Sequence, residues 1–371
     1  MKTFFVKKIL PLFVLALSLM PFISCQDVIF DTIRKEVQLE SGNIAGDIRS
    51  IVRFKDKYYL ANGGIFWKHK DWKYYGSWVP GAAPNGQVLK LAADNNCLYA
   101  LVGISVENEK EGTNVGSSRG VYYSNDGSVW KPVTGLGNNG LIPYNSKAIV
   151  YTYIFCTNSI KEENRMAYFA LNTKTSQAGV ANKVYLLDGA DVIDLPLGTK
   201  DADTQPVNTA TIVSRSCVWY DGNVYFFSSN ASTTNETDSA LPTMYYYGFG
   251  SYLRWGGTSV NPIGVQCKSE IQSLGVTADY ILVGTNAGIT HNILSKGVPG
   301  LPVPFATNAE STLGAAYRVL SILVTNPELN ETQTSIYASQ VYVGNGSSNS
   351  AQFDHVGLWA YYPARGNWNR E

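Results

Sequence analysis

The chain has 371 residues, which suffices for two or three ordinary domains or for one large all-β domain. Lys plus Arg number 29 and Asp plus Glu also number 29, so net charge gives no electrostatic reason to expect nucleic acid as a partner. The composition favours strands, with 24 Tyr, 14 Phe, 8 Trp and 34 Gly. Aromatic side chains fit a pleated, half-buried surface, and Gly supplies the turns between short strands.

The start of the chain predicts an export signal. Three lysines precede or border the apolar run 9–20, and this run is shorter than the roughly 20 apolar residues that a transmembrane helix needs. No later segment reaches that length either. We therefore expect the first residues to direct export and not to span a membrane as a stable helix.

The signal ends in Phe22-Ile23-Ser24-Cys25, which resembles the lipobox of bacterial lipoproteins. The resemblance implies that residues 1–24 form a lipoprotein signal peptide and that Cys25 becomes the diacylated N-terminus. It further implies a short tether over residues 25–36 and a folded domain over residues 37–371. Several acyl chains, palmitate among them, anchor a protein firmly, because each buried CH₂ contributes about 0.8 kcal/mol. An ordinary secretory signal with an incidental Cys is the alternative.

Four further cysteines are present, and the sequence favours buried free thiols at these positions. Most of them lie in or beside apolar strand runs, where Cys behaves as a small hydrophobe. One or more disulfides stay open as the alternative, since an exported chain meets an oxidant. There is no Cys-x-x-Cys pair and the three His are far apart, so neither a metal nor another cofactor is expected. The four are Cys97, Cys156, Cys217 and Cys267.

A weak internal repeat runs through the chain after the signal. Its unit is an apolar run, a polar turn, a Tyr-bearing strand, Gly and another aromatic strand, as expected for antiparallel hairpins. Several copies close at a Trp with Gly close by. The copies cover residues 48–68, 88–123, 147–187, 211–229 with a continuation to 255, 271–293 and 317–361.

Three or four short strands per copy, at roughly 40 to 70 residues each, predict a single all-β domain that is a β-propeller. Six blades are expected, with seven as the alternative, and a strand at Val37-Gln38-Leu39 is expected to pair with the last copy. A pair of β-sandwiches is the competing fold. A closed ring is favoured because it hides sheet edges that two sandwiches expose. No helix is expected beyond the signal. Polar segments predict surface loops at 104–118, 198–209, 230–241 and 344–352.

The stretch Ser124-Asn125-Asp126-Gly127-Ser128-Val129-Trp130 resembles the Asp-box of sialidase-like propellers, in a variant where Gly directly follows Asp. We expect the Asp carboxylate to accept backbone N–H bonds across the turn and Gly to supply a positive φ. Trp130 is expected to pack under the hairpin between blades. In the families that carry it, the box lies away from the catalytic centre. The resemblance therefore indicates a structural turn at Ser124, Asp126, Gly127 and Trp130 and no activity.

The sequence does not contain a recognisable catalytic set, and we expect a protein that is not an enzyme. A sialidase-like enzyme needs three arginines for the substrate carboxylate, a Tyr nucleophile with a Glu partner and an Asp acid. Only ten Arg are present. Arg53 and Arg215 are candidates to face a central channel, and a solvent-facing or blade-pairing role is the alternative. No Gly-x-Ser-x-Gly elbow, His-Glu-x-x-His helix or phosphate-binding Gly loop occurs.

A dense aromatic and basic cluster follows the first copy. Trp side chains and interleaved Lys are typical of recognition patches, while packing between blades is the competing interpretation. The residues of this possible binding patch are Trp67, Lys68, Trp72, Tyr74 and Tyr75.

The lipobox and the degenerate propeller repeat together resemble treponemal, spirochaetal-type families of propeller-bearing surface or periplasmic lipoproteins. Some members of these families are described as binding fibronectin or other host matrix proteins. The resemblance implies a non-enzymatic protein that a lipid anchors to the membrane of the cell envelope, on the outer membrane or its periplasmic face. It implies an adhesin or antigen whose partner is a host matrix protein. The alternatives are a periplasm-facing scaffold of an envelope complex and a glycan-binding or sialidase-like propeller.

Overall fold

The computed structural model describes a defined part of the chain, and the account below is restricted to that part. All of these residues except Arg370 belong to one compact unit. The described residues are 44, 46–72, 78–107, 114–143, 150–157, 164–173, 183–195, 214–220, 223–228, 243–248, 251–254, 271–276, 280–285, 288–293, 303–304, 317–325, 340–347, 356–362 and 367–371. The predicted signal over 1–24, Cys25, the tether over 25–36, the strand at 37–39, Tyr74, Tyr75 and Cys267 lie outside the described residues.

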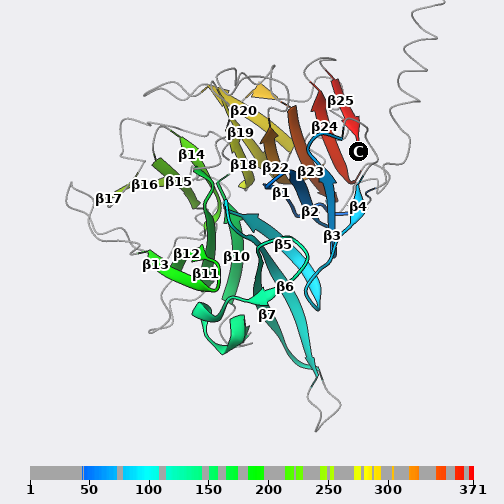
Figure 1. Cartoon of the computed structure of the whole chain (residues 1–371). Coiled ribbons are helices and arrows are strands. Elements are labelled where there is room, and N and C mark those ends of the chain that lie inside the picture. The colour runs from blue at the N-terminus through cyan, green and yellow to red at the C-terminus, as the bar shows by residue number, and fades with distance from the viewer. Residues whose placement is uncertain are drawn as a thin grey trace, which may run out of the picture. The chain divides into compact units, whose positions relative to one another are not determined.

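The fold is all-β, and within the described ranges the strands form six antiparallel sheets (Figure 1). The first four strands of every sheet are ordered as in the chain, so each sheet is a meander built from one continuous segment. Sheet 1 contains β1 (Ser50–Phe54), β2 (Lys57–Ala61), β3 (Ile65–His69) and β4 (Val79–Pro80). Sheet 2 contains β5 (Gln87–Ala93), β6 (Leu98–Glu107), β7 (Asn114–Ser124) and β8 (Lys131–Pro132), and β9 (Leu141–Pro143) pairs with β7.

The other four sheets follow the same plan. Sheet 3 contains β10 (Val150–Cys156), β11 (Ala167–Thr173), β12 (Lys183–Asp188) and β13 (Asp191–Leu195). Sheet 4 contains β14 (Ser214–Tyr220), β15 (Asn223–Ser228), β16 (Thr243–Gly248) and β17 (Ser251–Arg254). Sheet 5 contains β18 (Ile271–Val276), β19 (Tyr280–Thr285), β20 (Gly288–Ile293) and β21 (Val303–Pro304). Sheet 6 contains β22 (Tyr317–Thr325), β23 (Gln340–Ser347), β24 (Leu358–Tyr362) and β25 (Asn367–Arg370).

The first strands of the sheets are the elements that hold the sheets together. β1 contacts β5, β5 contacts β10, β10 contacts β14, β14 contacts β18 and β18 contacts β22. β22 in turn contacts β1, so the succession of contacts returns to its start. Small meander sheets joined through their first strands are the arrangement of a β-propeller. The predicted all-β, propeller-like class is therefore confirmed, and the two-sandwich alternative is wrong.

The hydrophobic core lies between neighbouring sheets. One cluster joins Val52 of β1, Leu91 of β5 and Ile154 of β10. A second joins β10 and β11 to Cys217 of β14, and a third joins Leu282 of β19 to β22 and β23. A fourth joins sheet 1 to sheet 6. Burying an aliphatic or aromatic side chain contributes roughly 1.5–3 kcal/mol, so these faces are the main attraction between the sheets.

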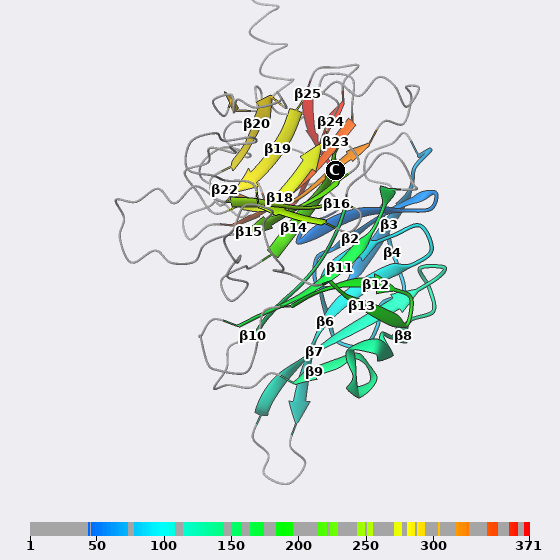
Figure 2. The same ribbon diagram turned by 90° about the vertical axis from the view of Figure 1, so that its left-hand side faces the viewer.

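Two details of the predicted loops are corrected by the structure. The polar segment 104–118 was expected to be a surface loop, but β6 continues to Glu107 and β7 begins at Asn114. Strands pair through backbone groups, as Ile104 does with Ser118, and this pairing does not require apolar side chains. The two strands therefore continue into the polar segment. Figure 1 shows this hairpin running on beyond β5, and Figure 2 shows β9 beside β7. Likewise β23 extends to Ser347, into the segment expected to be a loop at 344–352.

Helical structure is minor in the part of the chain that the structure describes. It includes two 3₁₀ turns, Thr134–Leu136 and Asn138–Gly140, which follow β8 and were not expected from the sequence, and Asn164 is also in 3₁₀ conformation. Asn139 has a φ of 54° within the second turn. Among the described segments, no helix has the length and apolar character to cross a membrane.

Candidate functional site

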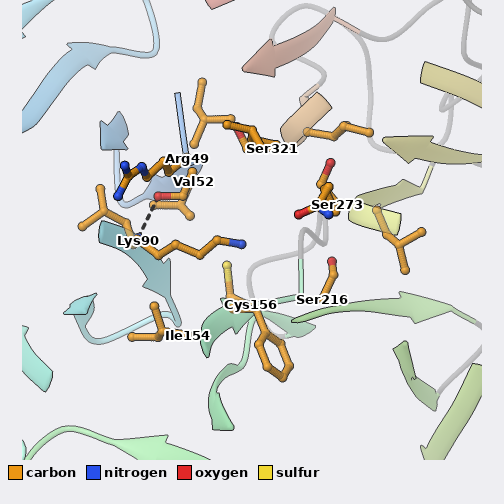
Figure 3. A pocket seen from close by; sticks show the side chains of 16 residues that line it. Arg49, Val52, Lys90, Ile154, Cys156, Ser216, Ser273 and Ser321 are labelled. Atoms are coloured by element: carbon orange, nitrogen blue, oxygen red, sulfur yellow. Dashed lines mark hydrogen bonds between the residues drawn. The ribbon is translucent and has the colours of Figure 1, made fainter. Parts of the chain in front are cut away.

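A pocket of about 40 Å³ lies where the first strands of all six sheets come together (Figure 3). Every one of β1, β5, β10, β14, β18 and β22 contributes lining residues, and Arg49 adds a side chain just before β1. A site of this kind is a property of the whole ring, because no single sheet forms its wall. The residues used below are Arg49, Ser50, Lys90, Cys156, Ser216, Gln272, Ser273, Leu320 and Ser321.

Four of the six first strands place a serine in this pocket, and all four side chains are buried. Buried hydroxyls need hydrogen-bond partners. Two of them donate to the next sheet: Ser273 Oγ to the Val319 carbonyl at 3.1 Å, and Ser321 Oγ to the Ile48 carbonyl at 3.2 Å. The four serines are Ser50, Ser216, Ser273 and Ser321.

The Ser50 hydroxyl oxygen accepts a hydrogen bond from the neighbouring sheet. The Leu91 backbone N–H donates to Ser50 Oγ at 2.7 Å, which joins sheet 1 to sheet 2 while leaving the Ser50 hydroxyl proton to be donated elsewhere. Ser50, Ser273 and Ser321 thus connect neighbouring sheets beside the pocket.

Four of the first strands are irregular at this depth. The pairing register shifts between Val88 and Lys90 in β5 and between Ser214 and Cys217 in β14. It also shifts in β18 around Gln272 and in β22 around Leu320. A β-bulge bends its strand and changes the direction in which side chains point. These bulges explain why residues that neighbour one another in sequence, such as Gln272 and Ser273, both line the pocket.

Two basic side chains, Arg49 and Lys90, line the pocket. Figure 3 shows the Lys90 ammonium reaching into it toward the Cys156 thiol, with the Arg49 guanidinium at one side. Among the described lining residues there is no Asp or Glu. Arg53 and Arg215 were candidates for this channel, with a solvent-facing or blade-pairing role as the other interpretation. Arg53 does not line the pocket, and the Arg215 side chain lies outside the described part.

Lys90 and Arg49 were missed by the sequence analysis, although a signal for the site exists. Aligning the copies on their first strands puts Ser50, Lys90, Ser216, Ser273 and Ser321 at one position, each directly before a buried apolar residue. A polar residue that recurs at one place in an apolar strand marks a shared environment. In a ring of repeated sheets that environment is the axis.

The cysteines of the described residues are free thiols. Cys97, Cys156 and Cys217 are all buried and unbridged. Burial raises the pKa of Cys156 to about 11, and burial together with the neighbouring Cys156 raises the pKa of Cys217 well above its ordinary value. Both thiols are therefore protonated near neutral pH, which makes them poor nucleophiles and poor metal ligands.

The turn between β7 and β8 is built around one carboxylate. Asp126 Oδ1 accepts the backbone N–H groups of Ser128 at 2.8 Å and Val129 at 2.9 Å, and the Ser124 hydroxyl donates to the same oxygen at 2.9 Å. Gly127 has a φ of +79°, and a Cβ there would run into the Tyr59 ring. Trp130 Nε1 donates to the Ala82 carbonyl at 3.0 Å, which ties the turn to the connection between sheets 1 and 2.

The charge of Asp126 stabilises this turn, and the effect depends on pH. The Val129 and Ser128 N–H groups hold the pKa of Asp126 well below its ordinary value. A depressed folded pKa gives stability that is present above the unfolded pKa, about 3.9, and is lost as pH falls through the folded value. We expect Asp126→Ala to lower Tm clearly at pH 7 and the gap to wild type to narrow below about pH 4. Thermal unfolding of wild type and Asp126→Ala at pH 7 and below pH 4 measures the difference in Tm. A difference that does not change with pH would contradict the role of the Asp126 charge.

The aromatic patch predicted from the sequence is only partly assembled among the described residues. Trp67 and the exposed Trp72 have ring centroids 5.4 Å apart, and Lys57 Nζ lies 4.0 Å from the Trp67 centroid. Trp72 is 40% exposed. Lys68 does not join this surface, since it is buried on the other face of β3 and pairs with Glu371.

A second pocket, of about 180 Å³, lies between sheets 2 and 3 beside the turn that begins at Asp94. Asp94 Oδ1 accepts the N–H groups of Asn96 and Cys97, and Tyr99 donates its hydroxyl to Asp94 Oδ2 at 2.7 Å. Tyr99 in turn accepts the Gly189 N–H from sheet 3. Burial raises the pKa of Asp94. The hydrogen bonds of Tyr99 to Asp94 and Gly189 connect sheet 2 to sheet 3.

Among the described residues, no group of three or more His, Cys, Asp and Glu side chains gathers.

In the comparison with known families, residues 3–127 match the model of the TP013X lipoprotein family. The matched segment covers about a third of the chain and includes Cys25 and sheet 1. No curated protein matches the sequence.

Solved structures similar to this chain are distant in sequence. A luciferin-regenerating enzyme is 9% identical over 87% of this chain and 92% of its own, with a TM-score of 0.46. The N-terminal domain of Nup159 is 9% identical over 85% of this chain and 75% of its own, with a TM-score of 0.38. U3-55K is 12% identical over 89% of this chain and 82% of its own, also with a TM-score of 0.38.

Proposed function

We propose that this chain is a lipid-anchored, non-enzymatic, six-bladed β-propeller that binds a protein ligand, as a surface adhesin or antigen. The observation that carries the proposal is the lipoprotein-family match over residues 3–127, which spans the lipobox-like stretch and Cys25. Six blades are supported by the six meander sheets of the described residues and by the contact of β22 with β1.

The central pocket supports a binding role more than catalysis. Its volume of about 40 Å³ is far below the roughly 300–1,000 Å³ of sites that enclose drug-sized ligands. The buried thiols of Cys156 and Cys217 are held protonated. A macromolecular ligand is therefore expected to contact the outer surface of the propeller.

The Trp67–Trp72 pair is the part of that surface we assign to the ligand. Trp is enriched among the residues that dominate binding energy, and Trp72 is one of the few large hydrophobic side chains exposed among the described residues. Lys57 adds positive charge beside the rings. Fibronectin and laminin are the ligands to try first, because the family resemblance implies a host matrix protein.

The anchor and the ligand are tested on the full chain. Wild type is expected to carry acyl chains on Cys25 and to enter the detergent phase, while Cys25→Ser stays in the aqueous phase. Detergent-solubilised wild type is expected to bind immobilised fibronectin or laminin saturably, and Trp72→Ala to bind at least tenfold more weakly. Ile193→Ala, at an exposed position of sheet 3, is the matched control and should bind as wild type does. An unmodified Cys25, or no saturable binding to either protein, contradicts the proposal.

A further inference from the structure

The pocket between sheets 2 and 3 is larger than the central one, at about 180 Å³ against about 40 Å³. A single water takes up about 10–15 Å³ of such a volume, so the larger pocket has room for roughly a dozen waters or for one small organic molecule. Its walls come from the turn between β5 and β6, the residues that enter β11, and strands β12 and β13. A molecule bound there contacts both sheets.

The charges of the described lining favour a cation. Two carboxylates, Asp94 and Asp188, and one guanidinium, Arg165, line the pocket, which leaves one negative charge in excess. Arg165 is buried and has interactions of its own. Burial raises the pKa of Asp94, and the charge of Asp188 raises it further, so the two carboxylates are close enough to repel each other. A cation bound beside them relieves this repulsion.

The hydrogen bonds of Asp94 also fit a ligand that donates. The backbone N–H groups of Asn96 and Cys97 donate to Asp94 Oδ1 at 2.7 and 2.6 Å, and the Tyr99 hydroxyl donates to Oδ2 at 2.7 Å. All three partners are donors, which is the pattern of an ionised carboxylate, and a carboxylate accepts about four hydrogen bonds. Asp94 therefore has capacity for a further donor. Asp188 is exposed, so its carboxylate lies at the mouth of the pocket.

Much of the remaining wall is apolar. Leu187 is buried, and Met166 and Leu186 are half-buried. Ile193 is 51% exposed and is one of the few large hydrophobic side chains exposed among the described residues. An aliphatic group in the pocket covers this surface and removes it from water, which is favourable. The pocket thus combines carboxylates with aliphatic walls.

We propose that this pocket binds a small organic cation with an aliphatic body, of the alkylammonium class. The carboxylates of Asp94 and Asp188 hold the charged end through charge-assisted hydrogen bonds, and the body lies against Met166, Leu186 and Ile193. An inorganic cation makes no use of the apolar wall, and a neutral alcohol makes little use of the carboxylates. Because the ligand contacts sheets 2 and 3 together, binding stabilises the folded ring and not the unfolded chain.

Calorimetric titration of the full chain in non-ionic detergent with n-butylammonium chloride tests this, with sodium chloride at matched ionic strength as the reference. We expect one saturable site at millimolar ligand or below, and a Tm that rises and then reaches a plateau. Two further probes separate the parts of the ligand. n-Butanol keeps the aliphatic body and methylammonium chloride keeps the charge, and each should bind at least tenfold more weakly.

Asp188→Asn should weaken n-butylammonium binding at least tenfold, because it removes a charge-assisted hydrogen bond at the mouth of the pocket. Asp191→Asn is the matched control: Asp191 is exposed, pairs with Asp188 across the hairpin of β12 and β13, and does not line the pocket. This control should bind as wild type does. Trp72→Ala should also bind n-butylammonium as wild type does, because the proposal does not depend on the adhesin role.

Equal loss in Asp188→Asn and Asp191→Asn means that the general negative charge of the hairpin attracts the cation, and it overturns the proposal. Wild type without a saturable heat overturns it too, as does n-butanol or methylammonium bound as tightly as n-butylammonium. If Asp188→Asn lacks the strand signal in circular dichroism, Ile193→Ala replaces it, with a loss of about threefold or more expected from the smaller apolar contact.

Discussion

Replacing Glu371 with Gln is expected to lower the free energy of unfolding by about 3–5 kcal/mol, because it leaves a buried lysine without its counter-charge. Lys68 Nζ lies 3.0 Å from Glu371 Oε2, with side chains 2% and 0% exposed. Trp78 Nε1 donates to the same oxygen at 3.1 Å. The Glu371 backbone N–H donates to Leu358 of sheet 6, so this residue fastens sheet 6 to sheet 1.

Urea denaturation of the full chain measures the change, and a surface pair supplies the matched control. Lys183 and Asp194 lie 3.2 Å apart with side chains 45% and 55% exposed, so Asp194→Asn should change stability by no more than about 1 kcal/mol. The double variant Lys68→Met with Glu371→Leu should recover much of the loss, since apolar replacement removes both desolvated charges. If Glu371→Gln and Asp194→Asn lower the free energy of unfolding by the same small amount, the Lys68–Glu371 ion pair does not hold sheets 1 and 6 together.

Gly344→Ala is expected to lower the free energy of unfolding by about 1–3 kcal/mol, because it overpacks the contact between sheet 6 and sheet 1. Gly344 in β23 pairs with Ser321 in β22, across the bulge. A Cβ at this position would lie 2.6 Å from the carbonyl oxygen of Ile48, the residue whose carbonyl accepts the Ser321 hydroxyl. Backbone moves less readily than the end of a side chain, so the two sheets would have to separate locally.

Gly64→Ala is the control for this substitution. A Cβ at Gly64 meets no atom within 4 Å, and this glycine is not among those with a positive φ. Its unfolding midpoint should match that of wild type or rise slightly, because Ala reduces the entropy of the unfolded chain. An unfolding midpoint of Gly344→Ala within error of that of Gly64→Ala would contradict the close approach of Ile48 to β23.

The sheets could be predicted from the sequence because each sheet pairs strands that are close to one another in the chain. Every copy of the repeat folds as consecutive hairpins, so pairings such as Phe54 with Lys57 span only a few residues and leave a turn signal between them. The ring itself also followed from the recurrence of these copies. The polar hairpin of β6 and β7 was missed because strand pairing continued where hydrophobic alternation had stopped.

The site was harder to predict because it depends on register and on distant contacts. A shift of one residue turns a strand side chain to the other face, and bulges introduce such shifts near Lys90 and Gln272. Arg53 in β1 was considered for the channel, whereas Arg49, directly before β1, lines the pocket, and β1 pairs with β2 without a register shift. The pairing of Lys68 with Glu371 joins residues 303 positions apart, and no local pattern marks it.

Protease treatment of intact cells tests the proposed surface role most directly. A lipid-anchored adhesin must present its propeller to the outside, so we expect added protease to cleave the chain while a known periplasmic protein in the same cells stays intact. Protection of the chain until the outer membrane is broken would contradict the adhesin role and favour a periplasm-facing scaffold.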